Sequence, residues 1–174
     1  MKKFLIVVDM QKDFVDGALG TKEALEIVPN VVRKIKGFDG EIIATYDTHY
    51  ENYMETNEGK HLPVPHCIKG TDGWQLNADI ATALETRDYT TVEKLTFGST
   101  TLPEIIKQKA ANEPFTVELI GLCTDICVVS NALILKANFP EAQISVDSNC
   151  CAGVTPESHT AAINTMKMCQ IEIK

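Results

Sequence analysis

The sequence lacks any apolar run long enough to cross a lipid bilayer, since a spanning helix needs about 20 such residues. Its first apolar run, residues 4–8, stops at Asp9 and is too short for the core of a signal peptide. Internal repeats, low-complexity tracts and linkers are also absent. We therefore expect a cytoplasmic protein whose single domain spans residues 1–174, a length sufficient for a substantial hydrophobic core.

Basic residues are scarce as well. The chain has 16 Lys and Arg against 24 Asp and Glu, so its net charge is −8. A surface this acidic argues against nucleic acid or an anionic membrane as a partner. We expect a small-molecule substrate instead, and a homo-oligomer.

The six cysteines do not predict a disulfide framework, because cytoplasmic thiols are reduced and this chain can form a core without disulfides. Cys150 and Cys151 follow an expected strand and are interpreted as packing residues. His159, near the start of the last expected helix, is expected at the surface.

Buried apolar runs alternate along the chain with segments of helical periodicity. This alternation predicts a three-layer α-β-α fold around a mainly parallel sheet of roughly six strands. Ligands of such sheets bind beyond the carboxyl ends of the strands, at the topological switch point. Strands are expected at residues 3–8, 41–45, 90–93, 117–121, 143–147 and 170–173, and helices at 24–36, 76–84, 101–110, from about 125 onward, and at 156–169.

Cys127 lies in the first turn of the helix expected after strand 117–121. Unpaired N–H groups and the helix dipole favour a thiolate there, and the same groups could receive an oxyanion. Asp9 and Lys94 end two other strands, where a carboxylate could take the thiol proton and an ammonium could balance the charge. The structural alternatives are an inert core cysteine and a buried Asp9–Lys94 salt bridge.

Asp47, His49 and His66 form a candidate metal site. In an extended Asp-x-His segment both side chains face the same way, and His66 could close the site from the long segment 50–73. Two imidazoles and a carboxylate suit zinc or iron. The alternative is a pair of solvated loop histidines. Further ligands could come from the acidic residues of the same segment, which are Glu51, Glu55 and Glu58.

Five short motifs occur in a characteristic order. They are VVDMQKDF at 7–14, DTH at 47–49, PHCIKGT at 65–71, EK at 93–94 and GLCTDICV at 121–128. In these motifs the chain resembles the isochorismatase-like cysteine hydrolases, and within them it is most similar to the nicotinamidases. The resemblance implies the isochorismatase-like hydrolase fold and cleavage of a small carboxamide to a carboxylic acid and ammonia.

The resemblance also implies a catalytic triad of Cys127, Asp9 and Lys94. Cys127 would attack the carboxamide carbonyl and form a thioester, while Asp9 would carry the thiol proton to the departing ammonia. A cis peptide is implied between Leu122 and Cys123. The backbone N–H groups of Cys123 and Cys127 would then form the oxyanion hole.

For the second site, the resemblance implies one divalent metal that holds the ring nitrogen of the substrate. Its ligands would be Asp47, His49 and His66, with Glu58 as the fourth by its spacing from His49. Zinc is the expected ion, and iron or manganese are alternatives.

The chain departs from the nicotinamidase pattern around the substrate ring. Phe14 matches one aromatic wall, but Pro63 replaces a tryptophan and Ile126 replaces a ring just before the nucleophile. Phe97 is the expected substitute. These changes leave three alternatives to nicotinamide hydrolysis: another small amide or ureide cleaved by the same triad, isochorismatase activity, and a non-enzymatic small-molecule-binding module.

Overall fold

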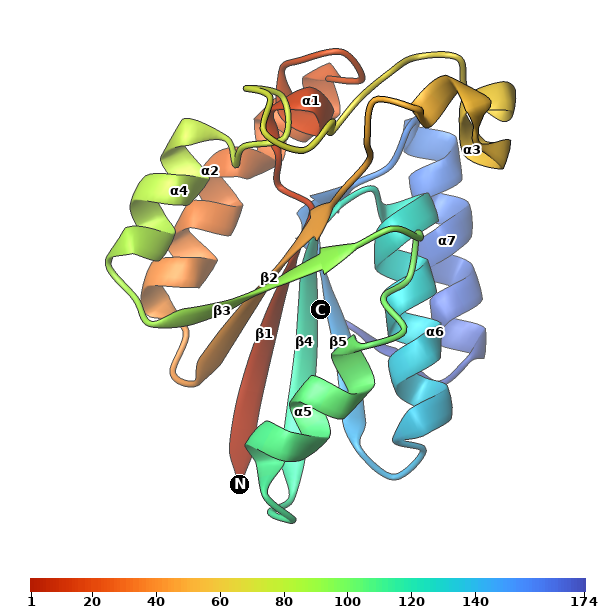
Figure 1. Cartoon of the computed structure of the whole chain (residues 1–174). Helices are drawn as coiled ribbons and strands as arrows, with labels where there is room; N and C mark the ends of the chain where they lie inside the picture. The colour runs from red at the N-terminus through yellow and green to blue at the C-terminus, as the bar shows by residue number, and fades with distance from the viewer.

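The computed structural model describes all residues, 1–174, and contains one six-stranded sheet with helices on both faces (Figure 1). All five strand pairs are parallel, in the order β3-β2-β1-β4-β5-β6. The predicted three-layer α/β fold is therefore confirmed. The strands are β1 Lys2–Val8, β2 Glu41–Asp47, β3 Tyr89–Lys94, β4 Phe115–Leu122, β5 Gln143–Ala152 and β6 Glu172–Ile173.

The connections between strands are mostly helical. No helix combines the length and apolar character needed to cross a membrane. The α-helices are α1 Lys12–Val15, α2 Lys22–Gly37, α3 Asn57–His61, α4 Ala78–Glu85, α5 Leu102–Ala110, α6 Val129–Asn138 and α7 Pro156–Met168. A 3₁₀ turn covers Tyr53–Glu55, and a π-helical turn covers Thr124–Val128.

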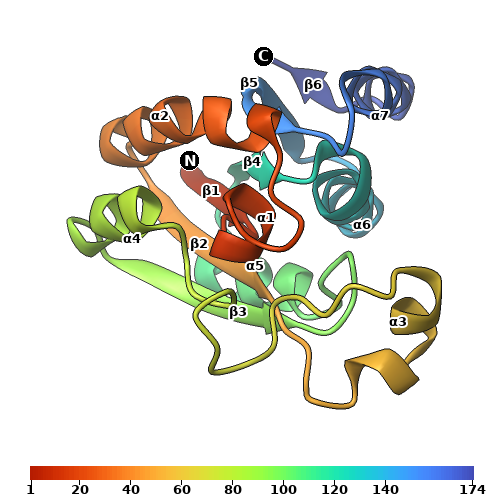
Figure 2. The same cartoon turned by 90° about the horizontal axis from the view of Figure 1, so that it is seen from above.

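Two hydrophobic cores lie on opposite faces of the sheet (Figure 2). One packs α2 and α4 against residues such as Leu5 and Val7, and the other packs α5, α6 and α7 against residues such as Phe4 and Ile6. Successive β1 residues therefore enter different cores, and all five residues from 4 to 8 have no exposed surface. This double burial explains why β1 reads as a continuous apolar run rather than as an alternating one.

The chain passes from one half of the sheet to the other after β3, by way of α5, and the switch point lies between the neighbouring strands β1 and β4. Strands β2 and β3 extend the sheet on one side of β1, and β4, β5 and β6 extend it on the other. The residues that follow β1 and β4 thus flank the switch point, where α/β sheets bind ligands. Both strands point toward the end of the sheet that carries α1 and α3 (Figure 1).

Two segments differ most clearly from the sequence-based prediction. The strand expected at 143–147 continues to Ala152, because its pairing with β4 shifts register between Leu119 and Gly121 and then resumes at Cys151. Cys150 and Cys151 therefore lie within β5, and each is buried in one of the two cores. The segment 50–73, which showed no periodicity, contains the 3₁₀ turn and α3.

Gly121 allows β1 and β4 to approach closely beside the switch point. Its φ is +116°, and a Cβ placed there would lie 2.1 Å from the carbonyl oxygen of Val8. Only glycine fits both the backbone conformation and the space. Because Asp9 follows Val8 directly, this contact also fixes the end of β1.

We expect Gly121→Ala to lower the free energy of unfolding by about 3 kcal/mol, from backbone strain plus the clash with β1. Gly37→Ala is the matched control, since a Cβ at Gly37 meets nothing within 4 Å. That change should leave stability unchanged or raise it by up to about 1 kcal/mol. Urea titrations followed by circular dichroism measure both values. Equal stabilities for the two variants would contradict this account of Gly121.

Candidate active site

Asp9, Lys94 and Cys127 meet at the carboxyl end of the sheet. The Lys94 Nζ lies 2.6 Å from Asp9 Oδ2 and 3.4 Å from Cys127 Sγ. All three residues are at most 5% exposed. Sequence alone placed each of them at a strand end; the structure brings them into one cluster.

The Asp9 carboxylate is aimed by its backbone and by β2. Its φ is +47°, and the Thr45 hydroxyl donates to Oδ1 at 2.6 Å. The Asp9 N–H donates back to the Thr45 carbonyl at 3.2 Å. Oδ2 is thereby left to the Lys94 ammonium, which also contacts the Cys127 sulfur, so Oδ2 is the carboxylate oxygen without a hydroxyl donor.

The charges of this cluster are tightly coupled. Burial, reinforced by the Asp9 carboxylate, raises the pKa of the Cys127 thiol, and Lys94 opposes that shift. Burial also raises the pKa of the Asp9 carboxyl, again against Lys94. Although burial disfavours its charge, the anionic neighbours hold the pKa of Lys94 well above its usual range. One proton shared between sulfur and carboxylate, beside a fixed ammonium, is the arrangement these directions favour.

Cys127 lies just before α6 rather than within the first turn of an α-helix, which is where the sequence analysis expected it. Cys127 lies in the π-helical turn Thr124–Val128, and α6 begins only at Val129. In this turn the N–H groups of Ile126 and Val128 both donate to the Cys123 carbonyl. Burial and the neighbouring carboxylate therefore raise the pKa of the Cys127 thiol in this turn.

Asn131 connects the π-helical turn Thr124–Val128, which carries the proposed nucleophile Cys127 and is called the nucleophile turn below, to the loop after β3. Its side-chain amide donates to the Cys127 carbonyl at 2.8 Å and to the Phe97 carbonyl at 3.3 Å, and its oxygen accepts from the Ser99 N–H at 2.9 Å. Asn131 has no exposed surface. The peptide bond between Leu122 and Cys123, before the turn, is cis, as the resemblance implied.

Asp47, His49, Glu58 and His66 form a second cluster. Their ligand atoms all lie within 4.8 Å of one another. The His49 Nε2 is 3.0 Å from Asp47 Oδ2 and 3.5 Å from Glu58 Oε1. The His66 Nε2 is 3.6 Å and 3.7 Å from the same two oxygens. Glu58 thus joins the three residues from which the metal site was predicted, whereas Glu51 and Glu55 do not.

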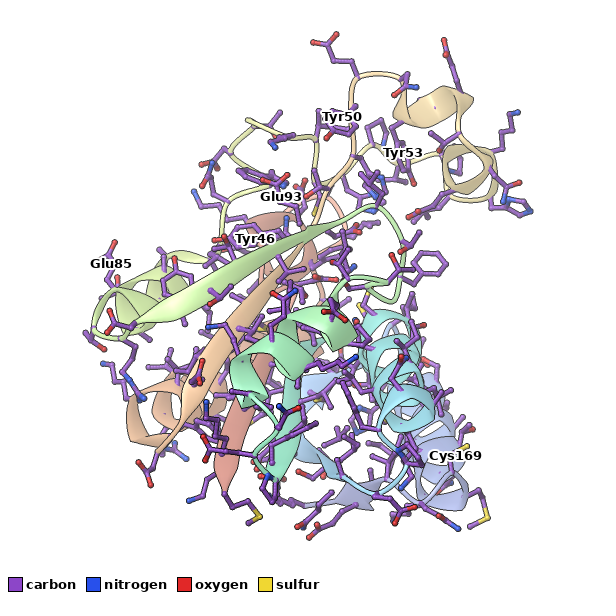
Figure 3. All side chains as sticks on the ribbon, turned by 60° about the horizontal axis from the view of Figure 1, so that its bottom comes forward. Tyr46, Tyr50, Tyr53, Glu85, Glu93 and Cys169 are labelled. Carbon is purple, nitrogen blue, oxygen red and sulfur yellow. The ribbon has the colours of Figure 1, made fainter.

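The imidazoles of this cluster are oriented for metal binding. The His66 Nδ1 lies 2.8 Å from the Val64 carbonyl, which requires Nδ1 to carry the proton and leaves the Nε2 lone pair facing the cluster. Tyr53 packs edge-on against both rings, 4.7 Å from His49 and 5.1 Å from His66 between centroids. Figure 3 shows Tyr53 on the segment that projects beyond the sheet. Nitrogen and oxygen acceptors that converge in this way fit a divalent cation.

Lys94 also connects the two clusters. Its Nζ lies 3.2 Å from Asp47 Oδ1, on the carboxylate whose Oδ2 faces the histidines. Burial raises the pKa of the Asp47 carboxyl, but hydrogen bonds with His49 and His66 and the Lys94 charge hold it well below its usual range. Gln11 fixes the Asp47 backbone, with Nε2 donating to its carbonyl and Oε1 accepting from its N–H, both at 2.8 Å.

A cavity of about 800 Å³ opens onto both clusters. Cys127 and the four metal-site candidates line it, as do three of the residues predicted for the substrate pocket: Phe14, Phe97 and Ile126. Pro63 does not line the cavity. It is exposed, and the adjacent Leu62 lines the cavity instead.

Several supporting residues escaped the sequence analysis. Thr45 ends the predicted second strand, Gln11 lies two residues after Asp9, and Asn131 lies four residues after Cys127, on the same side of the helix. Those spacings were the available signals. His159, expected at the surface, is half-buried, with Nδ1 2.7 Å from the Thr124 hydroxyl at the start of the nucleophile turn. Burial lowers the pKa of His159.

Known proteins resemble this chain in sequence and in fold. The nicotinamidase/pyrazinamidase of Mycobacterium tuberculosis (strain ATCC 25618 / H37Rv) is 25% identical over 185 residues, covering 97% of this chain and 96% of the relative. The pyrazinamidase/nicotinamidase structure from Streptococcus mutans UA159 superposes with a TM-score of 0.86 at 28% identity, covering 99% of this chain and all of that one.

A third protein is a pyrazinamidase of Pyrococcus horikoshii, whose crystal structure is a complex with zinc. It superposes with a TM-score of 0.82 at 28% identity, covering 100% of this chain and 99% of that one. The sequence profile of the Isochorismatase domain matches residues 3–173. With almost the whole chain matched, this protein belongs to the isochorismatase family.

Proposed function

We propose that this protein is a cysteine amidase that hydrolyses a small, nicotinamide-like carboxamide to the carboxylic acid and ammonia. The observation that carries the proposal is the position of Lys94. Its ammonium contacts the Cys127 sulfur, the Asp9 carboxylate and the Asp47 carboxylate, and of these partners Cys127 and Asp47 line one cavity. The proposed nucleophile and the candidate metal centre thus face one cavity, where both could contact the same substrate.

The proposed reaction begins with transfer of the Cys127 thiol proton to Asp9 Oδ2. The sulfur then attacks the amide carbonyl, and the N–H groups of Cys123 and Cys127 would stabilise the oxyanion. Collapse of this intermediate breaks the C–N bond, and the departing nitrogen takes the proton from Asp9 and leaves as ammonia. A thioester on Cys127 remains.

Water completes the proposed cycle. Asp9, ionised again, takes a proton from the water that attacks the thioester, and the C–S bond breaks to release the carboxylic acid. The Asp9 proton returns to the Cys127 sulfur. The Lys94 ammonium compensates the negative charge throughout the cycle, whether the Asp9 carboxylate or the Cys127 sulfur carries it.

We propose that Asp47, His49, Glu58 and His66 hold one divalent metal, with zinc as the first candidate. The mixed imidazole and carboxylate set suits zinc, and iron and manganese are the alternatives. The zinc complex of the Pyrococcus relative supports this choice. When bound, the ion would supply a Lewis acid that accepts an electron pair from the substrate ring.

The resemblance to nicotinamidases is supported by the aromatic walls of the cavity. Phe14 lines it and also packs edge-on against His66, with 5.4 Å between ring centroids. Phe97 lines it from the loop after β3. A flat aromatic amide gains about 0.5–1.5 kcal/mol from such a face beyond its area burial.

Ammonia release from nicotinamide tests the proposed nucleophile and base. Cys127→Ala should abolish turnover, and Asp9→Asn should lower kcat by about 10²–10⁴-fold, because proton transfer in the transition state is lost. The matched control is Cys150→Ala, which removes another buried thiol, one that lies in β5 and does not line the cavity. Near wild-type ammonia release by Cys127→Ala would refute the proposed mechanism.

Metal analysis after dialysis tests the second cluster. The wild-type chain should retain about one metal ion, whereas His49→Ala should retain almost none, because it removes one of the convergent ligands. His61→Ala is the control, since His61 lies nearby on α3 but is exposed and outside the cluster. This assignment would be contradicted by a wild-type protein that binds no divalent metal, or by a His49→Ala variant that binds one metal ion per chain.

A further inference from the structure

The outer part of the substrate cavity has an apolar rim. Leu62, Leu95, Phe97 and Val154 line the cavity and are 38%, 62%, 47% and 51% exposed. They come from three separate segments: the end of α3, the loop after β3, and the turn between β5 and α7. Large apolar side chains gathered at one opening mark a surface that a ligand covers.

The cavity is larger than a single-ring amide requires. Its volume of about 800 Å³ is in the range of pockets that enclose drug-sized ligands. An amide whose carbonyl lies at Cys127 and whose ring lies beside the metal-site candidates occupies only the inner end. The space between that ring and the rim is left for a substituent.

The rim is built on anchored backbone rather than on loose loops. Asn131 holds the Phe97 carbonyl and the Ser99 N–H, and the Val154 N–H contacts both Asp125 carboxylate oxygens at 3.1 and 3.2 Å. The loop of Leu95 and Phe97 also lies tightly on α6, because a Cβ at Gly98 would lie 2.4 Å from Ile134 Cδ1. A preformed apolar surface loses little entropy when a ligand covers it.

The charge of the lining defines the substituent. No lysine or arginine lines the cavity, and its only carboxylates are Asp47 and Glu58, both in the metal-site cluster. An anionic substituent would therefore find no permanently charged cationic partner, since the remaining titratable lining residue outside the metal-site cluster, apart from the cysteines, is His61, and a cationic substituent would have to share the two carboxylates with the proposed metal. The lining fits an uncharged, apolar group.

We propose that the preferred substrate is an aromatic carboxamide with an apolar substituent that reaches the rim formed by Leu62, Leu95, Phe97 and Val154. This inference rests on the proposed amide hydrolysis and narrows its substrate class. The substituent is remote from the reacting carbonyl, so its burial should strengthen substrate and transition-state binding alike. It should lower KM with little change in kcat.

A series of nicotinamides with 5-methyl, ethyl, propyl and butyl groups tests this inference with the metal-loaded protein. We expect kcat/KM for ammonia release to rise about two- to fourfold per added methylene, mainly through KM, as apolar surface leaves water. Leu95→Ser should flatten the rise, and so should Val154→Ser, a second variant at an exposed site. Met168→Ser, on α7 and 83% exposed outside the cavity, is the control and should keep the full slope.

The outcomes separate this inference from the proposed function. Hydrolysis of nicotinamide with a flat or falling alkyl series would overturn the apolar-substituent proposal alone. A rising series that Leu95→Ser and Val154→Ser leave as steep as in the wild type would also overturn it. Ammonia release from no member of the series, nicotinamide included, would overturn both proposals.

Discussion

The Lys94 ammonium is the charge around which the site is arranged. A buried ammonium is costly unless anionic partners surround it, and removal of one partner from such a group is strongly destabilising. Here the partners come from three different elements: Asp9 after β1, Asp47 at the end of β2, and Cys127 after β4. Lys94 ends β3, at one edge of the sheet, and its long side chain reaches groups that follow β1, β2 and β4.

This arrangement depends on parallel strands that end at a common edge. The close approach of β1 and β4 at Gly121 brings the Asp9 carboxylate and the nucleophile turn together at the switch point. The segment between β2 and α4 then adds Glu58 and His66, which the sheet itself could not supply. Tyr50 and Tyr53 lie on this projecting segment, whereas Cys169 lies at the far end of α7, away from the site (Figure 3). The sheet thus positions Asp9, Lys94 and Cys127, and the projecting segment completes the cluster proposed to hold the metal.

Much of this could be predicted from sequence, because strand alternation has a direct physical meaning. Buried apolar runs that end in Asp9, Asp47 and Lys94 predict three charged groups at one edge of the sheet. The position of Glu58 followed only from its spacing, and the structure adds its oxygen to the cluster. Fold class was therefore accessible from local pattern, whereas the composition of both clusters was also implied by the resemblance to a known family.

The remaining features depend on tertiary contacts that no local pattern encodes. The length of β5 follows from a register shift in its pairing with β4. The raised pKa of the Cys127 thiol follows from its burial beside Asp9. Leu62 rather than Pro63 lines the cavity, and Asn131 matters because the β3–α5 loop packs against α6. Each of these features needs the position of a residue distant in sequence.

The central claim is that Lys94 favours the anionic form of the Cys127–Asp9 pair. The most direct test is the pH dependence of Cys127 alkylation by iodoacetamide, followed by peptide-mapping mass spectrometry in the wild-type chain and in Lys94→Met. Because the ammonium lowers the pKa of the neighbouring thiol, its removal should move the alkylation curve of folded Lys94→Met to higher pH. Superimposed curves for the two proteins would contradict the claim.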